Sequence, residues 1–358
     1  TVEVEETSRA ALANLQALIK SLGEDVVLLQ AYMVEGGVNF LLTTPDIQIA
    51  RHSAVSNREL NRQVGKFRGL LSGDPVADPL PMAQSLYKLL LAPIEQDLVQ
   101  SGAKTVMLSL DGSLRYLPFT ALHDGQRYAV QRWNMPLYNS VVRDRLREGV
   151  NPQWTVAGLG VTRQQGEFPA LPGVQAELDS IVRSGNGGIL PGEVYLDDAF
   201  TAVRLKDISQ RTFPVVHIAS HFQFSPGTEI NSFLLLGDGS ELTLGDIRTQ
   251  NYRFDNVDLL TLSACNTGLG GGRDAKGIEI EGFGVIAQQQ GAKAVMATLW
   301  PVRDQSTALL MADMYREHKH GNVSKIEALR QAQLALLEQP KYASPHYWAP
   351  FILMGNWK

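Results

Sequence analysis

The sequence predicts an α/β protein of two domains, the second an α/β sandwich on a mostly parallel sheet. Its 358 residues are enough for two domains, each with a hydrophobic core. In the second half, short apolar runs alternate with amphipathic segments of helical length, a pattern typical of parallel strands joined by right-handed crossovers. The nearly continuous apolar run at residues 259–262 favours a central strand covered on both faces.

The first half opens with an amphipathic helix, expected at residues 11–22, and a hairpin of strands at 26–34 and 38–43. Two helical patterns follow, and Pro93 in the second is expected to start a new turn or to kink the helix. A strand is expected at 106–110, and short strands and turns at 114–138. The polar stretch at 143–152 is the expected boundary between an N-terminal domain, 1–150, and a C-terminal domain, 151–358.

The second half is expected to alternate regularly. Strands are expected at residues 155–161, near 194, and at 215–220, 259–264 and 294–299. Helices are expected at 174–182, 199–208, 281–290, 305–318 and 323–337. The last helix has apolar side chains at near-helical spacing, so it should cover one face of the sheet.

The composition limits the classes of function. A chain that is 44% hydrophobic and 19% charged is typical of a soluble globular protein. The net charge of -5, with acids and bases interspersed, gives no clustered basic face for nucleic acid. The apolar stretches are shorter than the roughly 20 residues that span a bilayer, so no membrane insertion is expected. The single cysteine excludes an internal disulfide and fits a cytoplasmic location. Because the chain begins at Thr1, we expect a fragment or a processed product.

Two predicted strand ends carry the candidate chemistry. The strand at 215–220 leads into His221, and the strand at 259–264 leads into Cys265. Reactive groups in open α/β sheets gather at the carboxyl ends of strands, and the stretch between these two strands is long enough for a loop and one crossover. A thiol has a pKa near about 8.5 and needs a base to act as a nucleophile. We therefore expect Cys265 to be a nucleophile and His221 its base.

A nucleophilic attack on a carbonyl also needs fixed donors for the negative charge that grows on oxygen. The backbone amides of Cys265 and Phe222 are the candidates, because both residues follow expected strand ends. Gly268 and the glycines at 270–272 come shortly after the cysteine and allow an irregular loop that covers a substrate.

Other interpretations of these residues stay open on the sequence alone. A lone cysteine at a strand end is most often a small buried apolar side chain, and the glycines alone indicate only a flexible loop. His217 and His221 lie four residues apart, but metal ligands at that spacing usually sit on helices, so no metal and no cofactor are expected here. His217 is expected to be a core residue with one hydrogen bond.

Several segments together resemble a known family. They are HIASH at 217–221, LSACNTG at 262–268, LWPVRD at 299–304 and YWAPF at 347–351, with LRYLPF at 114–119 and LHDG at 122–125 upstream. In this order they resemble the CHAT family, caspase-like cysteine peptidases that are related to separase and are often found behind tetratricopeptide repeats.

The resemblance implies a cysteine endopeptidase of the caspase and separase clan, with Cys265 and His221 at the positions of the catalytic dyad. It implies a caspase-like α/β sandwich for the second domain and a degenerate, inactive caspase-like copy for residues 1–150. Phe222 departs from the glycine that often follows the histidine in this clan, and its bulk would narrow the oxyanion site.

The expected specificity rests on acidic residues. Ser263 is neutral where some arginine- or lysine-specific relatives have an acid. Asp304 is the candidate for the specificity pocket and would favour a basic residue on the acyl side of the scissile bond, although its position fits a cap of the helix at 305–318 equally well. Glu279 and Glu281 are further candidates.

The predicted function is therefore cleavage of specific protein substrates through an acyl-enzyme. An activating protein or an upstream tetratricopeptide-repeat region is expected to switch this activity on through the glycine-rich loop. The alternative is a catalytically silent interaction module on the same fold. An esterase or acyltransferase with the same dyad also stays open.

Overall fold

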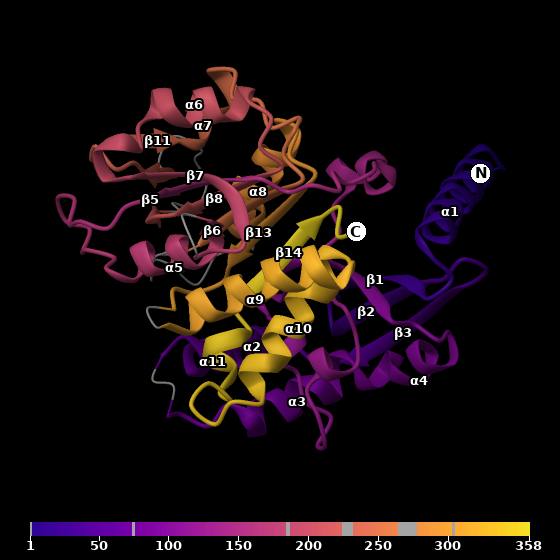
Figure 1. Cartoon of the computed structure of the whole chain (residues 1–358). Coiled ribbons are helices and arrows are strands. Elements are labelled where there is room, and N and C mark those ends of the chain that lie inside the picture. Colours follow the sequence, from indigo (N-terminus) through magenta and orange to yellow (C-terminus); the bar gives the residue numbers. More distant parts are fainter. Residues whose placement is uncertain (1, 74–75, 184–186, 224–231, 264–277, 303–304) are drawn as a thin grey trace. The chain divides into compact units, whose positions relative to one another are not determined.

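The computed structural model describes residues 2–73, 76–183, 187–223, 232–263, 278–302 and 305–358 (Figure 1). The chain divides into two compact units. The first comprises Thr1–Arg68 and Asp78–Tyr138, and the second comprises Gly69–Ala77 and Asn139–Lys358.

The first unit is built on a four-stranded sheet. Its strand order is β3 (Gln48–Ala54), β2 (Gly37–Thr43), β1 (Val26–Val34) and β4 (Thr105–Leu110). The predicted hairpin is confirmed as the antiparallel pair β1–β2, and β4 pairs with β1 in parallel. The strand β3 was not predicted, because this edge strand is mostly exposed and lacks the alternation of a half-buried strand. That this part of the chain is a degenerate caspase-like copy stays a prediction.

Four helices and a series of short turns complete this half of the chain. The helices are α1 (Val2–Leu22), α2 (Asn57–Ser72), α3 (Leu80–Leu90) and α4 (Ala92–Gln100). Pro93 lies in the first turn of α4, where a missing amide proton costs no helical hydrogen bond, so it begins a new helix. In place of the short strands expected at 114–138, the chain forms the 3₁₀ turns η1 (Gly112–Tyr116), η2 (Phe119–Ala121) and η3 (Ala129–Gln131).

The second unit contains a seven-stranded sheet. Its strand order is β14 (Phe351–Gly355), β13 (Ala294–Thr298), β12 (Leu259–Ser263), β8 (Val215–Ala219), β5 (Val156–Gly160), β7 (Leu190–Leu196) and β6 (Val182–Arg183). Every neighbouring pair is parallel except β13–β14, so the predicted mostly parallel sheet is confirmed. Each residue of the inner strands β5, β8, β12 and β13 is buried, as expected for strands covered on both faces.

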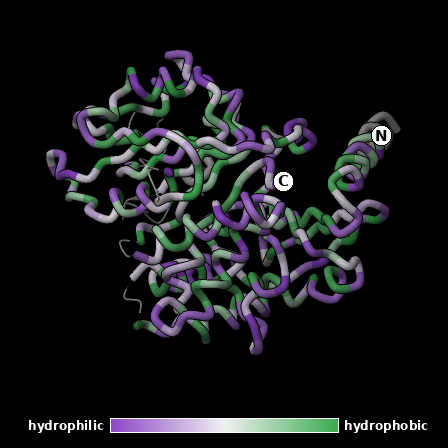
Figure 2. Tube along the Cα trace, in the orientation of Figure 1, coloured by the Kyte–Doolittle hydropathy of each residue, from purple (hydrophilic) through white to green (hydrophobic). Residues whose placement is uncertain are grey.

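Helices cover this sheet on two sides (Figure 1). On one face lie α5 (Gly173–Ile181) and α9 (Gln305–Gly321), and on the other lie α6 (Ala202–Gln210), α7 (Leu244–Thr249) and α8 (Ile278–Gln289). The helix α10 (Lys325–Leu337) packs on α9, and the short α11 (Pro345–Trp348) leads into β14. Figure 2 shows the hydrophobic segments running along the strands between these helices.

A small second sheet follows β8. It contains β9 (Phe222–Gln223), β10 (Phe233–Leu235) and β11 (Glu241–Thr243), all antiparallel. These short strands were not predicted, although Asp238-Gly239 between two apolar runs is a signal for the turn of a hairpin. Within the described part of the chain, no helix combines the length and the apolar composition that a bilayer crossing requires.

Candidate active site

The two strands predicted to carry the site are parallel neighbours. Ala219 at the end of β8 pairs in register with Ser263 at the end of β12, and the Ser220 amide donates a hydrogen bond to the Ser263 carbonyl at 3.3 Å. Both strands therefore end at the same edge of the sheet. His221 and Cys265 each follow one of the paired residues by two positions. Cys265 lies outside the described residues, as does the glycine-rich stretch that follows it.

His221 is buried and its imidazole is oriented by the loop before α5. Its Nε2 lies 2.8 Å from the Pro169 carbonyl oxygen, and the Phe168 ring packs against it with centroids 5.3 Å apart. Because a carbonyl oxygen only accepts, Nε2 must carry the proton in this hydrogen bond. In the neutral ring the lone pair is then on Nδ1, and this is the atom that can take up a proton.

His217 is part of a buried hydrogen-bond network below the sheet edge at which β8 and β12 end. Its Nε2 lies 2.9 Å from Glu177 Oε1 of α5, and its Nδ1 lies 3.0 Å from Tyr315 Oη of α9. Tyr315 Oη is also 2.9 Å from Thr261 Oγ1 of β12, and burial raises the pKa of this tyrosine, which stays neutral. The expectation of a single hydrogen bond for His217 is wrong, because helices on the covering layer supply a partner to each ring nitrogen.

Zinc binding by His217 and His221 would have to break hydrogen bonds that the two imidazoles make. Both ring nitrogens of His217 are engaged by Glu177 and Tyr315, and Nε2 of His221 is engaged by Pro169. Among the described residues, no three His, Cys, Asp or Glu side chains gather closely enough to hold a metal ion.

A cavity of about 420 Å³ lies beside His221. Its walls come from the loop before α5, the first turns of α5 and α9, the end of β12, and the two residues after Trp300. Most of the lining is apolar and includes Leu171, Pro172, Val174, Pro301, Val302 and Ala308. The cavity can therefore hold an uncharged side chain of a bound polypeptide.

The polar groups in this lining are few. Glu177 is held by His217, and Thr307 Oγ1 donates to the Val302 carbonyl at 3.2 Å. The hydroxyl of Ser263 is buried and has no hydrogen-bond partner among the described residues. It is thus a polar atom at the wall of the cavity that a bound group could satisfy.

Phe222 differs from its expected position at a free strand end. After Ser220 and His221 the chain enters β9, in which Phe222 pairs with Leu234, and the Leu235 amide donates to the His221 carbonyl at 2.9 Å. The hairpin of β9 and β10 was not foreseen, so the strand was expected to end there.

The candidate specificity residues fall largely outside the described structure. Asp304 lies outside the described residues, and of Glu279 and Glu281 only the helical backbone of α8 is described. Phe168, Pro169 and Glu177 were not predicted as site residues, because their roles depend on long-range contacts with His221 and His217. The only local signal was the proline-rich loop at 169–172 between a strand and a helix.

Comparison with known proteins places this chain in a family. The family model described as the CHAT domain matches residues 80–356. The chain belongs to the CHAT-domain family. A comparison with curated protein sequences finds no match.

Solved structures show what this CHAT-domain chain resembles in fold. Two crystal structures of the Saccharomyces cerevisiae separase–securin complex match with TM-scores of 0.61 and 0.55 at 9% sequence identity. They cover 99% and 98% of this chain but only 31% of the separase-complex chain in each case. The Arg-specific cysteine proteinase gingipain R matches with a TM-score of 0.47 at 11% identity, over 84% of this chain and 74% of that one. The likeness to the separase structures confirms the caspase-like α/β fold.

Proposed function

We propose that this CHAT-domain protein is a cysteine endopeptidase that cleaves protein substrates through an acyl-enzyme. Cys265 is the nucleophile and His221 is its base. The observation that carries the proposal is the register of β8 and β12, which gives Ala219 and Ser263 a common edge two residues before the two proposed catalytic residues. The oriented imidazole of His221 beside an apolar cavity supports the same assignment.

The chemistry follows from the orientation of the imidazole. Because Nε2 of His221 donates to the Pro169 carbonyl, Nδ1 is the ring nitrogen proposed to remove the thiol proton of Cys265. The carbonyl dipole also stabilises the imidazolium that results. The thiolate attacks the scissile carbonyl carbon, and the backbone amides of Cys265 and Phe222 are the proposed donors to the oxyanion.

The second half of the reaction uses the same two residues. The tetrahedral intermediate collapses as His221 returns its proton to the leaving amine, which gives a thioester on Cys265. Water, deprotonated by His221, then hydrolyses the thioester and restores the thiol. Neither step calls for a metal ion or a cofactor.

The substrate side chain at the scissile bond remains a separate proposal. The described lining of the cavity offers no carboxylate apart from Glu177, which is bound to His217, and so favours an uncharged side chain. A basic side chain would be favoured through Asp304, with Glu279 and Glu281 as the further candidate acids. A peptide library decides between them: a basic preference that disappears in Asp304→Ala supports the pocket acid, and a profile that is unaffected by this change supports the apolar cavity.

A covalent probe tests the catalytic proposal. A peptidyl acyloxymethyl ketone should label the wild-type chain once, as measured by intact mass, and should label neither Cys265→Ser nor His221→Ala at a comparable rate. The single cysteine makes the modified site unambiguous. If iodoacetamide alkylates the wild-type thiol but the peptidyl probe does not, even in the longer protein with its candidate activator, the endopeptidase proposal fails in favour of an interaction module.

The control of this activity is a further part of the proposal. The separase in the matching structures is in complex with securin, and we propose that a protein partner or an upstream repeat region likewise sets the activity of this domain. Turnover of one peptide by this chain and by the longer protein with its candidate activator tests the idea. Equal rates would show that no such switch exists.

A further inference from the structure

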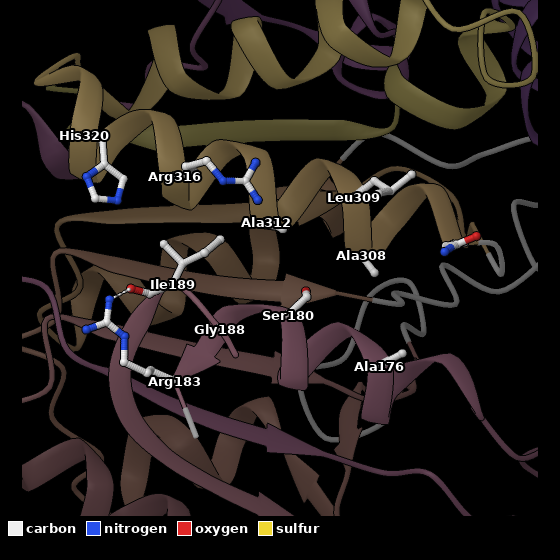
Figure 3. Close-up of a pocket in the computed structure, with 11 residues that line it drawn as sticks. Ala176, Ser180, Arg183, Gly188, Ile189, Ala308, Leu309, Ala312, Arg316 and His320 are labelled. Carbon is white, nitrogen blue, oxygen red and sulfur yellow. Dashed lines mark hydrogen bonds between the residues drawn. The ribbon is translucent and has the colours of Figure 1, made fainter. Parts of the chain in front are cut away.

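A second, basic pocket lies between α5 and α9 (Figure 3). Its volume is about 560 Å³. One wall is formed by side chains of α9 at successive turns, and the other by α5, the strand β6 and the two residues that precede β7. The residues that carry the argument are Ala176, Ser180, Arg183, Ala312, Arg316 and His320.

The charge of this pocket is one-sided. Its lining contains two guanidinium groups and one imidazole, from Arg183, Arg316 and His320, and no carboxylate among the described residues. Arg316 is paired with Asp313 on the same helix, but its planar group has five N–H donors and one carboxylate does not use them all. The pocket therefore presents unfilled donors to a ligand.

Arg183, at one end of the pocket, and Lys319, which is not part of the pocket lining, donate to the same backbone oxygen. Arg183 Nη2 donates to the Ile189 carbonyl at 3.2 Å, and Lys319 Nζ donates to the same oxygen at 2.6 Å. In the part of the chain that the structure describes, no carboxylate pairs with either cation. Burial and the nearby guanidinium of Arg183 lower the pKa of Lys319, as expected for like charges held together. An anion bound here would relieve that repulsion.

The basic pocket adjoins the cavity beside His221. The two share Ala176, Gln305 and Ala308 in their linings. Along α9, Arg316 lies two turns beyond Ala308, which corresponds to roughly 12 Å at the helical rise of about 1.5 Å per residue. An extended polypeptide covers that distance in about four residues.

We propose that the basic pocket binds an acidic side chain of the protein substrate, about four residues along the chain from the side chain that occupies the cavity. The proposal rests on the endopeptidase function, because it treats both spaces as parts of one substrate groove. The small side chains of Ala176, Ser180 and Ala312 between the charged end and the cavity leave room for a polypeptide backbone. The shared lining of the pocket and the cavity favours a peptide over a small free anion.

Peptide binding to the Cys265→Ala variant tests the proposal without any need for catalysis. The probe is a fluorescein-labelled, alanine-based peptide with one central leucine. It carries one glutamate four residues before the leucine and one glutamate four residues after it. By fluorescence anisotropy it should bind roughly threefold to tenfold more tightly than its glutamine counterpart, because partly exposed ion pairs contribute modestly. The difference should shrink as NaCl is raised from low to high concentration.

Matched variants locate the binding site. Arg183→Gln combined with Arg316→Gln should abolish the preference for glutamate, whereas Arg253→Gln, an exposed arginine outside the pocket lining, should leave it unchanged. Equal affinities for the two peptides, or a preference that survives the double change, would overturn the proposal. The proposal would also be overturned if inorganic phosphate bound through the two arginines while the glutamate peptide did not bind.

The spacing of the charges tests the continuity of the two spaces. A peptide of the same composition with the glutamates next to the leucine should bind more weakly than the spaced one. Equal binding of the two would contradict a shared groove. None of these results depends on acyl-enzyme chemistry, so failure of the peptidyl probe to label Cys265 would count against the endopeptidase proposal alone.

Discussion

Replacing Tyr315 by phenylalanine tests the role assigned to the buried network under the site. The hydroxyl of Tyr315 makes hydrogen bonds of 3.0 Å to His217 and 2.9 Å to Thr261, and both partners are fully buried. Tyr315→Phe keeps the ring and leaves two buried polar groups without their partner. Each buried polar group without a hydrogen-bond partner costs roughly 1–3 kcal/mol, and burying the less polar phenylalanine ring offsets part of that cost. We therefore expect the free energy of unfolding to fall by about 2–4 kcal/mol.

Thermal and urea unfolding measure this loss. A change of that size should lower the Tm by roughly 5–12 °C for a unit of this length. Thr261→Val removes one of the orphaned groups, so the double variant should be about 1 kcal/mol more stable than the sum of the single changes predicts. A loss below about 0.5 kcal/mol, or strictly additive effects, would refute the network. Labelling of Cys265 by the peptidyl probe should persist in the folded Tyr315→Phe protein.

Three further predictions concern pH, packing and metal. Burial and the nearby Lys325 lower the pKa of His318 from 6.5 to about 4. Between pH 6.5 and 4 the unfolded chain is therefore protonated at this residue before the folded chain is, and the folded state loses stability as the pH falls. The wild type should therefore lose roughly 1–3 kcal/mol more stability between pH 6.5 and 4 than His318→Asn, and equal pH profiles in urea unfolding would contradict this. A Cβ at Gly192 would lie 1.9 Å from the Val156 carbonyl oxygen, so Gly192→Ala should cost about 3 kcal/mol or more, whereas Gly149→Ala, with open space around it, should melt like the wild type. Dialysis against EDTA should leave labelling by the peptidyl probe unchanged, and a loss that zinc restores would show that a metal is required.

The sequence predicted the second unit well because its central strands are unusually simple in pattern. Strands buried on both faces, such as β8 and β12, are short apolar runs whatever their neighbours, and helices such as α9 and α10 separate them at regular intervals. The parallel order follows from that alternation. The predicted adjacency of β8 and β12 is confirmed by their register.

The missed elements have weaker local signals. The strand β3 is a polar edge strand and β9 is only two residues long, whereas β14 is a continuous apolar run that was not assigned as a strand. Their pairing depends on strands distant in the sequence, which a local pattern does not contain. The missed hairpin after β8 is the reason that Phe222 was expected at a strand end.

The same limit applies to the site. Strand ends can be predicted, and they placed His221 at the edge of the sheet. The partners that orient it cannot be predicted from spacing, because the Pro169 carbonyl is a backbone atom that any residue type could supply. The two hydrogen bonds of His217 come from α5 and α9, which lie far from it in the sequence.

The pH dependence of Cys265 alkylation by iodoacetamide tests the central claim most directly. If His221 is the base of Cys265, the wild type should react through a thiolate that forms well below the ordinary pKa of about 8.5, and His221→Ala should return the profile to that ordinary value. His217→Ala should lower stability and leave the alkylation profile of the folded protein unchanged. The same profile, with a midpoint near about 8.5, in the wild type and in His221→Ala would contradict the proposed dyad.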